Sequence, residues 1–198
     1  MKKKSNGRGM QGSRRQEILR IGAGLFREKG FDATTIRDIT AAVGIGSGST
    51  FCHFRSKRDI LDEVARHGMD LVLAEAEAVV RRALAPAEQL RTLIQRHMTL
   101  LHDPSSRDFV VVLLFEQRAL SAAAKAQLAA SMARYEALWE DCLRRLNLSQ
   151  KGRADVPVHR LLFGALNWTA HWLRPVADPS PQVLADEVAG LLLNGIPG

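Results

Sequence analysis

Apolar positions spaced three and four residues apart recur along most of the chain, a pattern typical of amphipathic α-helices. The first such stretch follows Ser13, which can cap a helix, and it ends at Gly30. A second stretch begins at Thr35, with Asp38 placed for a weak capping box, and Gly44 ends it. The apolar positions that should form the buried faces of these two helices are Ile18, Ile21, Leu25, Phe26, Ile36, Ile39 and Val43.

The residues that follow predict a tight turn and then a third short helix. Ile45 supplies the apolar residue of the turn, Ser47 or Ser49 can cap the helix, and Phe54 can pack its far end against the helix before it. This spacing is typical of a helix-turn-helix, in which Ser47 to His53 would enter the DNA major groove. Two core helices joined by a glycine turn are the alternative. The Gly, Ser, Thr, Cys and His composition favours DNA, because it allows close approach to phosphates and base edges.

The remainder of the sequence predicts six more helices, which makes about nine in an all-α chain. We expect them over residues 56–84, 87–102, 107–120, 121–148, 155–171 and 180–193. Pro86 must end the first of these or begin the next, and Gly68 is a candidate bend inside the first. The run FVVVLLF could equally form a buried strand, but no second strand is predicted to pair with it, so we expect a helix. The inward residues of the helix over 87–102 should be Leu90, Leu93, Ile94, Met98 and Leu101.

Positive charge is concentrated at the start of the chain. The formal net charge is +7, but residues 1–60 carry 13 Lys and Arg against 5 Asp and Glu, whereas residues 61–198 carry 15 against 16. Part of the excess lies in residues 1–12, a Gly- and Ser-rich basic arm that we expect to be disordered. The rest coincides with the predicted helix-turn-helix, which favours a polyanionic partner.

Several classes of protein are not favoured by the sequence. It has neither an apolar run of about 18 residues nor a secretory signal, so we expect a cytoplasmic protein without a membrane span. Cys52 and Cys142 are too few for a disulfide framework, and no two histidines have the four-residue spacing of a helical metal site. We expect no metal and no cofactor. Nucleophile-elbow, phosphate-loop and dinucleotide motifs are not found, so an enzyme is a distant alternative.

The segment ILRIGAGLFREKGFDATTIRDITAAVGIGSGSTFCHFRSKRDIL resembles the TetR family of bacterial transcription regulators. The resemblance covers about Arg14 to Leu61 and includes the KG followed by an aromatic residue, the two threonines, the glycine turn, the His-Phe pair and the Ser-Lys pair. It implies a helical homodimer with a DNA-binding domain over residues 13–58 and a ligand-binding and dimerisation domain over residues 59–198. By position, the residues that the resemblance places against DNA are Thr35, Arg37, Ser47, Gly48, Ser49, Phe51, Cys52, His53 and Lys57.

Separate roles can be argued for these side chains. Lys57 supplies a positive charge for a DNA phosphate, and the fork of Arg37 matches the O6 and N7 acceptors of guanine. Ser47 and Cys52 can touch base edges, and Ser49 and His53 favour phosphate contacts. Three residues depart from the family pattern: Phe51 replaces a tyrosine that bonds phosphate, Thr50 a leucine and Gly22 an alanine.

Aromatic and polar residues in the second half define a candidate ligand site. Trp168 and Trp172 lie four apart and share a helix face, with His171 and Asn167 on the adjoining face. Such a face fits either a pocket or a dimer seam, and the sequence leaves both open. The candidate ligand-binding residues are His97, Phe115, Trp168, His171 and Trp172. The segment GALNWTAHWLRP is similar to the C-terminal region of family members that respond to acyl-CoA thioesters.

The sequence therefore predicts a dimeric, ligand-responsive transcription regulator that binds a palindromic operator in double-stranded DNA. The family resemblance implies a repressor released by a small hydrophobic effector, with an acyl-CoA thioester as the first candidate. The alternative is a helical interaction module that does not bind DNA.

Overall fold

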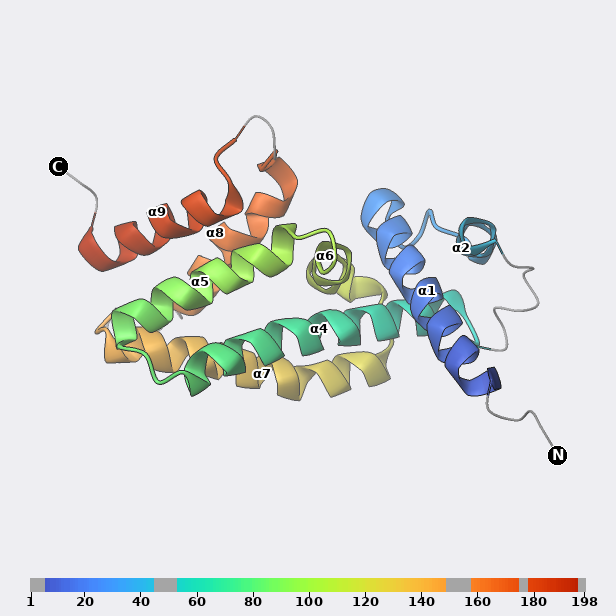
Figure 1. Cartoon of the computed structure of the whole chain (residues 1–198), viewed down its shortest axis with the longest axis horizontal. Helices are drawn as coiled ribbons and strands as arrows, with labels where there is room; N and C mark the ends of the chain where they lie inside the picture. The colour runs from blue at the N-terminus through green and yellow to red at the C-terminus, as the bar shows by residue number, and fades with distance from the viewer. Residues whose placement is uncertain (1–5, 45–52, 149–157, 175–177, 196–198) are drawn as a thin grey trace. The chain divides into compact units, whose positions relative to one another are not determined.

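The computed structural model of the chain describes residues 6–44, 53–148, 158–174 and 178–195, with side chains from Arg14 onward in the first range. Every regular element in those ranges is helical, and the predicted all-α fold is confirmed. Figure 1 shows the elements in chain order. They are α1 (Asn6–Lys29), α2 (Ile36–Val43), α4 (Lys57–Arg81), α5 (Pro86–His102), α6 (Arg107–Phe115), the 3₁₀ turn η1 (Gln117–Ala119), α7 (Ala122–Arg145), α8 (Val158–Trp172) and α9 (Pro181–Asn194).

The chain divides into two compact units. The N-terminal unit combines Met1–Gly68 with Asp108–Ala126, and the C-terminal unit combines Met69–Arg107 with Gln127–Gly198. Helix α4 contributes to both units, and most of α6 belongs to the N-terminal one although it follows α5 in sequence. The boundary between residues 58 and 59 stays a prediction.

Helix α1 differs from expectation at its start. It begins at Asn6, so Ser13 lies inside the helix and is not its cap. A capping residue marks a start only where something also stops the helix from extending, and no proline precedes Ser13. The buried face is as expected at Ile18 and Phe26, which are 0% and 1% exposed.

Helix α6 is shorter than the predicted 107–120. The FVVVLLF run is helical, which confirms that element, but the α-helix ends at Phe115 and a 3₁₀ turn follows. Ser121 then accepts a hydrogen bond from the Ala124 amide at 3.1 Å and caps α7.

The C-terminal unit has its core around α5. All five predicted inward residues of α5 are buried, and α5 packs against α8 and α9. Pro86 is the first residue of α5, where its missing amide hydrogen leaves no bond unmade. The described residues that complete this core include Val72, Val79, Trp139, Leu143 and Leu166.

Candidate nucleic-acid interface and effector site

Helix α2 is fixed at both ends by short-range hydrogen bonds. The Asp38 amide donates to Thr35 Oγ1 at 3.1 Å, and the Thr35 amide donates to Asp38 Oδ2 at 2.8 Å. These bonds complete the predicted capping box and lower the pKa of the Asp38 carboxyl. At the other end Gly44 takes the left-handed conformation, with φ 72°, and its amide bonds back to the helix.

The predicted DNA-contacting residues fall into two groups. Thr35, Arg37, His53 and Lys57 are described by the structure, whereas Ser47, Gly48, Ser49, Phe51 and Cys52 lie outside the described residues. Arg37 is exposed on α2, and nothing in its position conflicts with base contact. The side chain of Thr35 is exposed too, although its hydroxyl already bonds the Asp38 side chain at 2.8 Å.

The Lys57 ammonium is already occupied by backbone carbonyls. Its Nζ donates to the carbonyl oxygens of Phe31 at 2.6 Å, Thr34 at 2.7 Å and Asp32 at 3.4 Å. It also lies 4.1 Å from the centroid of the Phe31 ring. An ammonium has three hydrogens to donate, and here they face three acceptors. The proposed phosphate contact would therefore have to break bonds within the protein.

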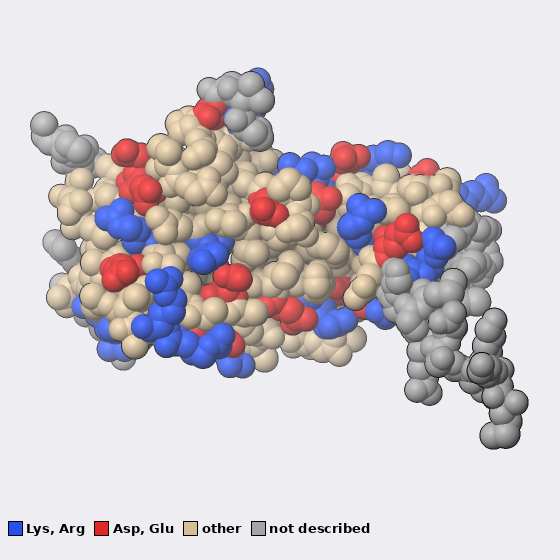
Figure 2. Space-filling model, in the orientation of Figure 1, with Lys and Arg blue, Asp and Glu red and all other residues tan. Residues whose placement is uncertain are grey.

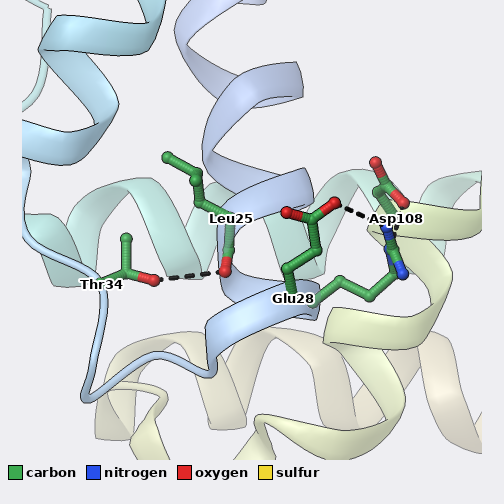
Figure 3. A network of polar contacts seen from close by, with 5 residues as sticks. Leu25, Glu28, Thr34 and Asp108 are labelled. Carbon is green, nitrogen blue, oxygen red and sulfur yellow. Dashed lines mark hydrogen bonds and ion pairs between the residues drawn. The ribbon is translucent and has the colours of Figure 1, made fainter.

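A buried threonine holds the loop before α2, and an ion pair joins α1 to α6. Thr34 is 0% exposed, and its hydroxyl lies within hydrogen-bonding distance of the Gly30 oxygen at 2.8 Å and the Leu25 oxygen at 3.3 Å. Nearby in the same unit, Arg27 Nε donates to Asp108 Oδ1 at 2.6 Å. Figure 3 shows Thr34 with its Leu25 partner, and Glu28 and Asp108 at the ends of the Arg27 contacts. Helix α6 is thereby tied to α1.

The C-terminal unit contains a small hollow lined by three helices. Its lining residues are Val72, Glu75, Ala76, Leu93, Arg96, His97, Leu100, Tyr135 and Trp139, from α4, α5 and α7. The free space is about 10 Å³, which is room for about one water molecule. A molecule larger than water can enter only if these helices or their side chains separate.

A neutral hydrogen-bonded network lies at this hollow. His97 Nε2 is 2.8 Å from Asn167 Oδ1, and His97 Nδ1 is 2.8 Å from the Tyr135 hydroxyl. Since the amide oxygen can only accept, Nε2 carries the imidazole hydrogen and the Tyr135 hydroxyl donates to Nδ1. Burial lowers the pKa of His97 to about 4 and raises the pKa of Tyr135. Both groups are neutral at physiological pH.

The structure separates the predicted ligand-binding residues. His97 lines the hollow, whereas Trp168 and Trp172 are 61% and 43% exposed on α8 and do not line it. The His171 ring lies 4.5 Å from the Trp168 ring, on the same helix. Phe115 belongs to the N-terminal unit, whereas the other four predicted ligand-binding residues belong to the C-terminal unit.

Two sequence profiles match the chain over both halves. The one described as "Bacterial regulatory proteins, tetR family" matches residues 18–64, and the one described as "Tetracyclin repressor-like, C-terminal domain" matches residues 83–196. The chain belongs to the TetR family of bacterial regulatory proteins.

Several named relatives of this TetR-family protein are transcriptional repressors. The transcriptional repressor KstR2 of Rhodococcus jostii is 30% identical over 188 residues, covering 92% of this chain and 91% of the relative. The solved structure of the ketosteroid transcriptional regulator KstR2 of Mycobacterium tuberculosis is 26% identical, with a TM-score of 0.77 over 98% of this chain and 97% of that one. AibR, solved with isovaleryl coenzyme A and operator DNA, shares the fold at 23% identity, with a TM-score of 0.80 over 91% of this chain and 98% of that one.

The described surface of this TetR-family regulator carries charges of both signs. On the face shown in Figure 2, acidic and basic side chains are interspersed over the described residues. Much of the positive excess of the sequence, including Lys2, Lys3 and Lys4, lies outside the described residues. Among the described residues, no helix is long and apolar enough to cross a membrane, and no group of three His, Cys, Asp or Glu side chains could hold a metal ion.

Sequence reasoning missed the partners that complete both sites. Asp108 and Glu116 on the α6 segment bond to α1 and to the loop before α2, yet they lie about 80 residues later in sequence. Tyr135 and Trp139 were not singled out as a pair, although their four-residue spacing on one helix was a usable signal.

Proposed function

We propose that this TetR-family regulator is a homodimeric repressor that binds a palindromic operator and is released when a hydrophobic effector opens the hollow of the C-terminal unit. The observation that carries the proposal is the hollow itself. Its apolar lining adjoins a neutral polar network, and part of the lining comes from α4, the helix that begins at Lys57 in the DNA-binding unit. Separating α4 from α5 and α7 would change the position of α4. The protein binds and releases, and we assign it no catalytic step.

The proposed effector combines an apolar body with a hydrogen-bond acceptor. Leu93, Leu100 and Val72 supply apolar lining. Trp139 Nε1 is buried beside the Tyr135 hydroxyl but makes no hydrogen bond of normal geometry with the described residues, so a carbonyl oxygen could accept its hydrogen. Arg96, half-exposed at the rim and 3.9 Å from Glu75, could pair with an anionic group. An acyl-CoA thioester has all three features. The isovaleryl coenzyme A bound to AibR makes short-chain thioesters the first compounds to test, and the name of the ketosteroid regulator KstR2 makes ketosteroids the second.

The proposed dimer seam is the apolar face of α8 and α9. Large apolar side chains of these helices are exposed in the single chain: Leu161 65%, Trp168 61%, Val183 51%, Leu191 48% and Trp172 43%. Large apolar side chains exposed in this way on two helices favour an interaction surface. Two copies of a helix pair related by a two-fold axis form a four-helix arrangement, and the same axis matches a palindromic operator.

Selection of bound sequences from random duplex DNA tests the DNA half of this proposal. We expect a palindromic motif with half-sites about one or two helical turns apart. Titration of acyl-CoAs into the complex should then release the DNA, and tryptophan fluorescence should change because Trp139 lines the hollow. Tight binding of a thioester without any change in DNA affinity would refute the proposed release mechanism.

Trp168→Glu tests the dimer half. The side chain is mostly exposed, so the substitution should leave the folded single chain intact and place two charges in the proposed seam. We expect monomers in sedimentation at micromolar concentration. Ala130→Glu is the matched control, because Ala130 is exposed on α7 outside the seam, and it should remain dimeric.

A further inference from the structure

The loop between α1 and α2 is held from two sides by charged side chains. Residues 30–35 form this loop, and it ends at Thr35, the N-cap of α2. The position of the loop therefore sets where α2 begins. We call the groups that hold it the loop clamp, which consists of Lys57 on α4 and Glu116 after α6.

Lys57 holds the loop by its carbonyl oxygens. The two short bonds, 2.6 Å to Phe31 and 2.7 Å to Thr34, lie on either side of the longer 3.4 Å contact to Asp32. The three acceptors come from one turn of backbone, so the ammonium acts as its internal cap. The Phe31 ring, 7% exposed, covers the same ammonium at 4.1 Å.

Glu116 holds the same loop by an amide. Its Oε1 accepts a hydrogen bond from the Phe31 amide at 3.2 Å, and a Cβ placed on Gly30 would lie only 3.6 Å from the same oxygen. Phe31 thus gives its carbonyl oxygen to Lys57 and its amide to Glu116. One residue joins α4 and the end of α6 to the start of α2.

We infer that Glu116 and Lys57 are positioning residues for DNA binding, which act by holding α2 through the loop and make no phosphate contact of their own. The inference rests on the proposed DNA-binding function. It assigns the segment from Asp108 to Ser121 to the DNA-binding machinery, because this segment also bonds Arg27 through Asp108 at 2.6 Å and because the Ser121 amide donates to Asp62 at 3.0 Å. A movement of α6 would be transmitted to α2 through the backbone of Phe31.

Glu116→Ala tests the α6 side of the clamp in the full-length protein. Hydrogen exchange of the free protein should show faster exchange over residues 30–36, because the Phe31 amide loses its acceptor. Affinity for the duplex selected by the wild-type protein should fall about tenfold, a typical strength for coupling between sites. Glu116→Gln keeps an acceptor oxygen and should restore most of both signals. Glu140→Ala, on the exposed side of α7, is the matched control.

Lys57→Ala distinguishes the clamp from a phosphate contact. Loss of a phosphate contact would reduce the slope of log affinity against log salt by about 0.9, whereas loss of a clamp should weaken binding with an unchanged slope. A slope reduced by that amount would overturn the clamp role of Lys57. If Glu116→Ala leaves both the hydrogen exchange of residues 30–36 and the affinity for DNA unchanged, the clamp role of Glu116 is overturned. If the wild-type protein selects no DNA, the proposed function fails, while the exchange experiment still decides whether the clamp holds the loop.

Discussion

The loop clamp and the hollow are both polar, but one is built from full charges and the other from neutral groups. In the N-terminal unit, the Lys57 ammonium and the Glu116 carboxylate bond backbone groups of the loop over residues 30–35. In the C-terminal unit, His97, Tyr135 and Asn167 bond one another through side chains, and burial keeps the imidazole uncharged.

The difference between charged and neutral groups fits the role proposed for each region. Bonds between a charged side chain and backbone are stronger than neutral ones, so the clamp favours a single loop position. A neutral network can be opened at lower cost, because no unpaired charge is left in the interior when its partners separate.

Acidification should cause the largest loss of unfolding free energy, and this loss should come from the neutral network of the C-terminal unit. The folded pKa of His97 is about 4 and its ordinary value is 6.5, so the unfolded chain takes up a proton in this interval while the folded chain does not. The contribution of His97 to stability is therefore complete above pH 6.5 and is lost as the pH falls toward 4. The difference between these two pKa values corresponds to about 3 kcal/mol of unfolding free energy, measurable by urea unfolding across this range.

His97→Gln provides the comparison for this prediction. Glutamine keeps hydrogen-bonding capacity but does not titrate, so the difference in stability between the two proteins should shrink as the pH falls from 6.5 to 4. His102, whose pKa is also lowered by burial, is present in both proteins and cancels in the difference. A difference that is constant across this pH range would mean that His97 is not held neutral.

Tyr135→Phe should break the neutral network while leaving the packing almost unchanged. Only the hydroxyl is removed, and the buried Nδ1 of His97 loses its donor at 2.8 Å. An unsatisfied buried acceptor costs about 1 to 3 kcal/mol, and we expect about 2 in thermal or urea unfolding. The double variant Tyr135→Phe, His97→Leu should lose less unfolding free energy than the sum of the losses in the two single variants, because it no longer contains the unpaired Nδ1 acceptor. Strict additivity would contradict the network.

The helices were predictable because their signals are local. The capping box at Thr35 and Asp38, the left-handed Gly44 and the proline at the start of α5 all act within a few residues of one another. The FVVVLLF run was resolved as a helix only by the lack of a pairing strand, since its residues favour either state. The early start of α1 was missed because a capping residue does not by itself stop a helix.

The candidate sites were less predictable because their partners are distant in sequence. Phe31 and Glu116 are 85 residues apart, and nothing in the local pattern connects them. Lys57 was expected at a phosphate from its charge, but the carbonyls that bind it could not be identified without the fold. Trp168 and Trp172 share a face as predicted, and only their exposure, 61% and 43%, favours a seam over a pocket.

Gly68→Ala should show how little space the N-terminal unit leaves between α4 and α6. A Cβ at this position would lie 2.5 Å from the Phe109 carbonyl oxygen, so the backbone of α6 must move. Overpacking of about 2 kcal/mol, reduced by about 1 kcal/mol of gained helix propensity, leaves a net loss of about 1 kcal/mol. An unfolding midpoint equal to or above that of the wild-type protein would show that α6 yields freely.

Arg37→Ala should leave stability unchanged and alter only the choice of DNA sequence. The side chain is exposed on α2, outside both the clamp and the neutral network, so the unfolding free energy should stay within about 0.5 kcal/mol. If its guanidinium bonds a guanine, discrimination at one base pair in each half-site should fall by about 1 to 3 kcal/mol. Loss of the clamp by Glu116→Ala should instead weaken all sequences together, because α2 is displaced as a whole. Repeating the selection from random duplexes with both variants measures this directly, and a uniform loss of affinity in Arg37→Ala would assign Arg37 to phosphate contact.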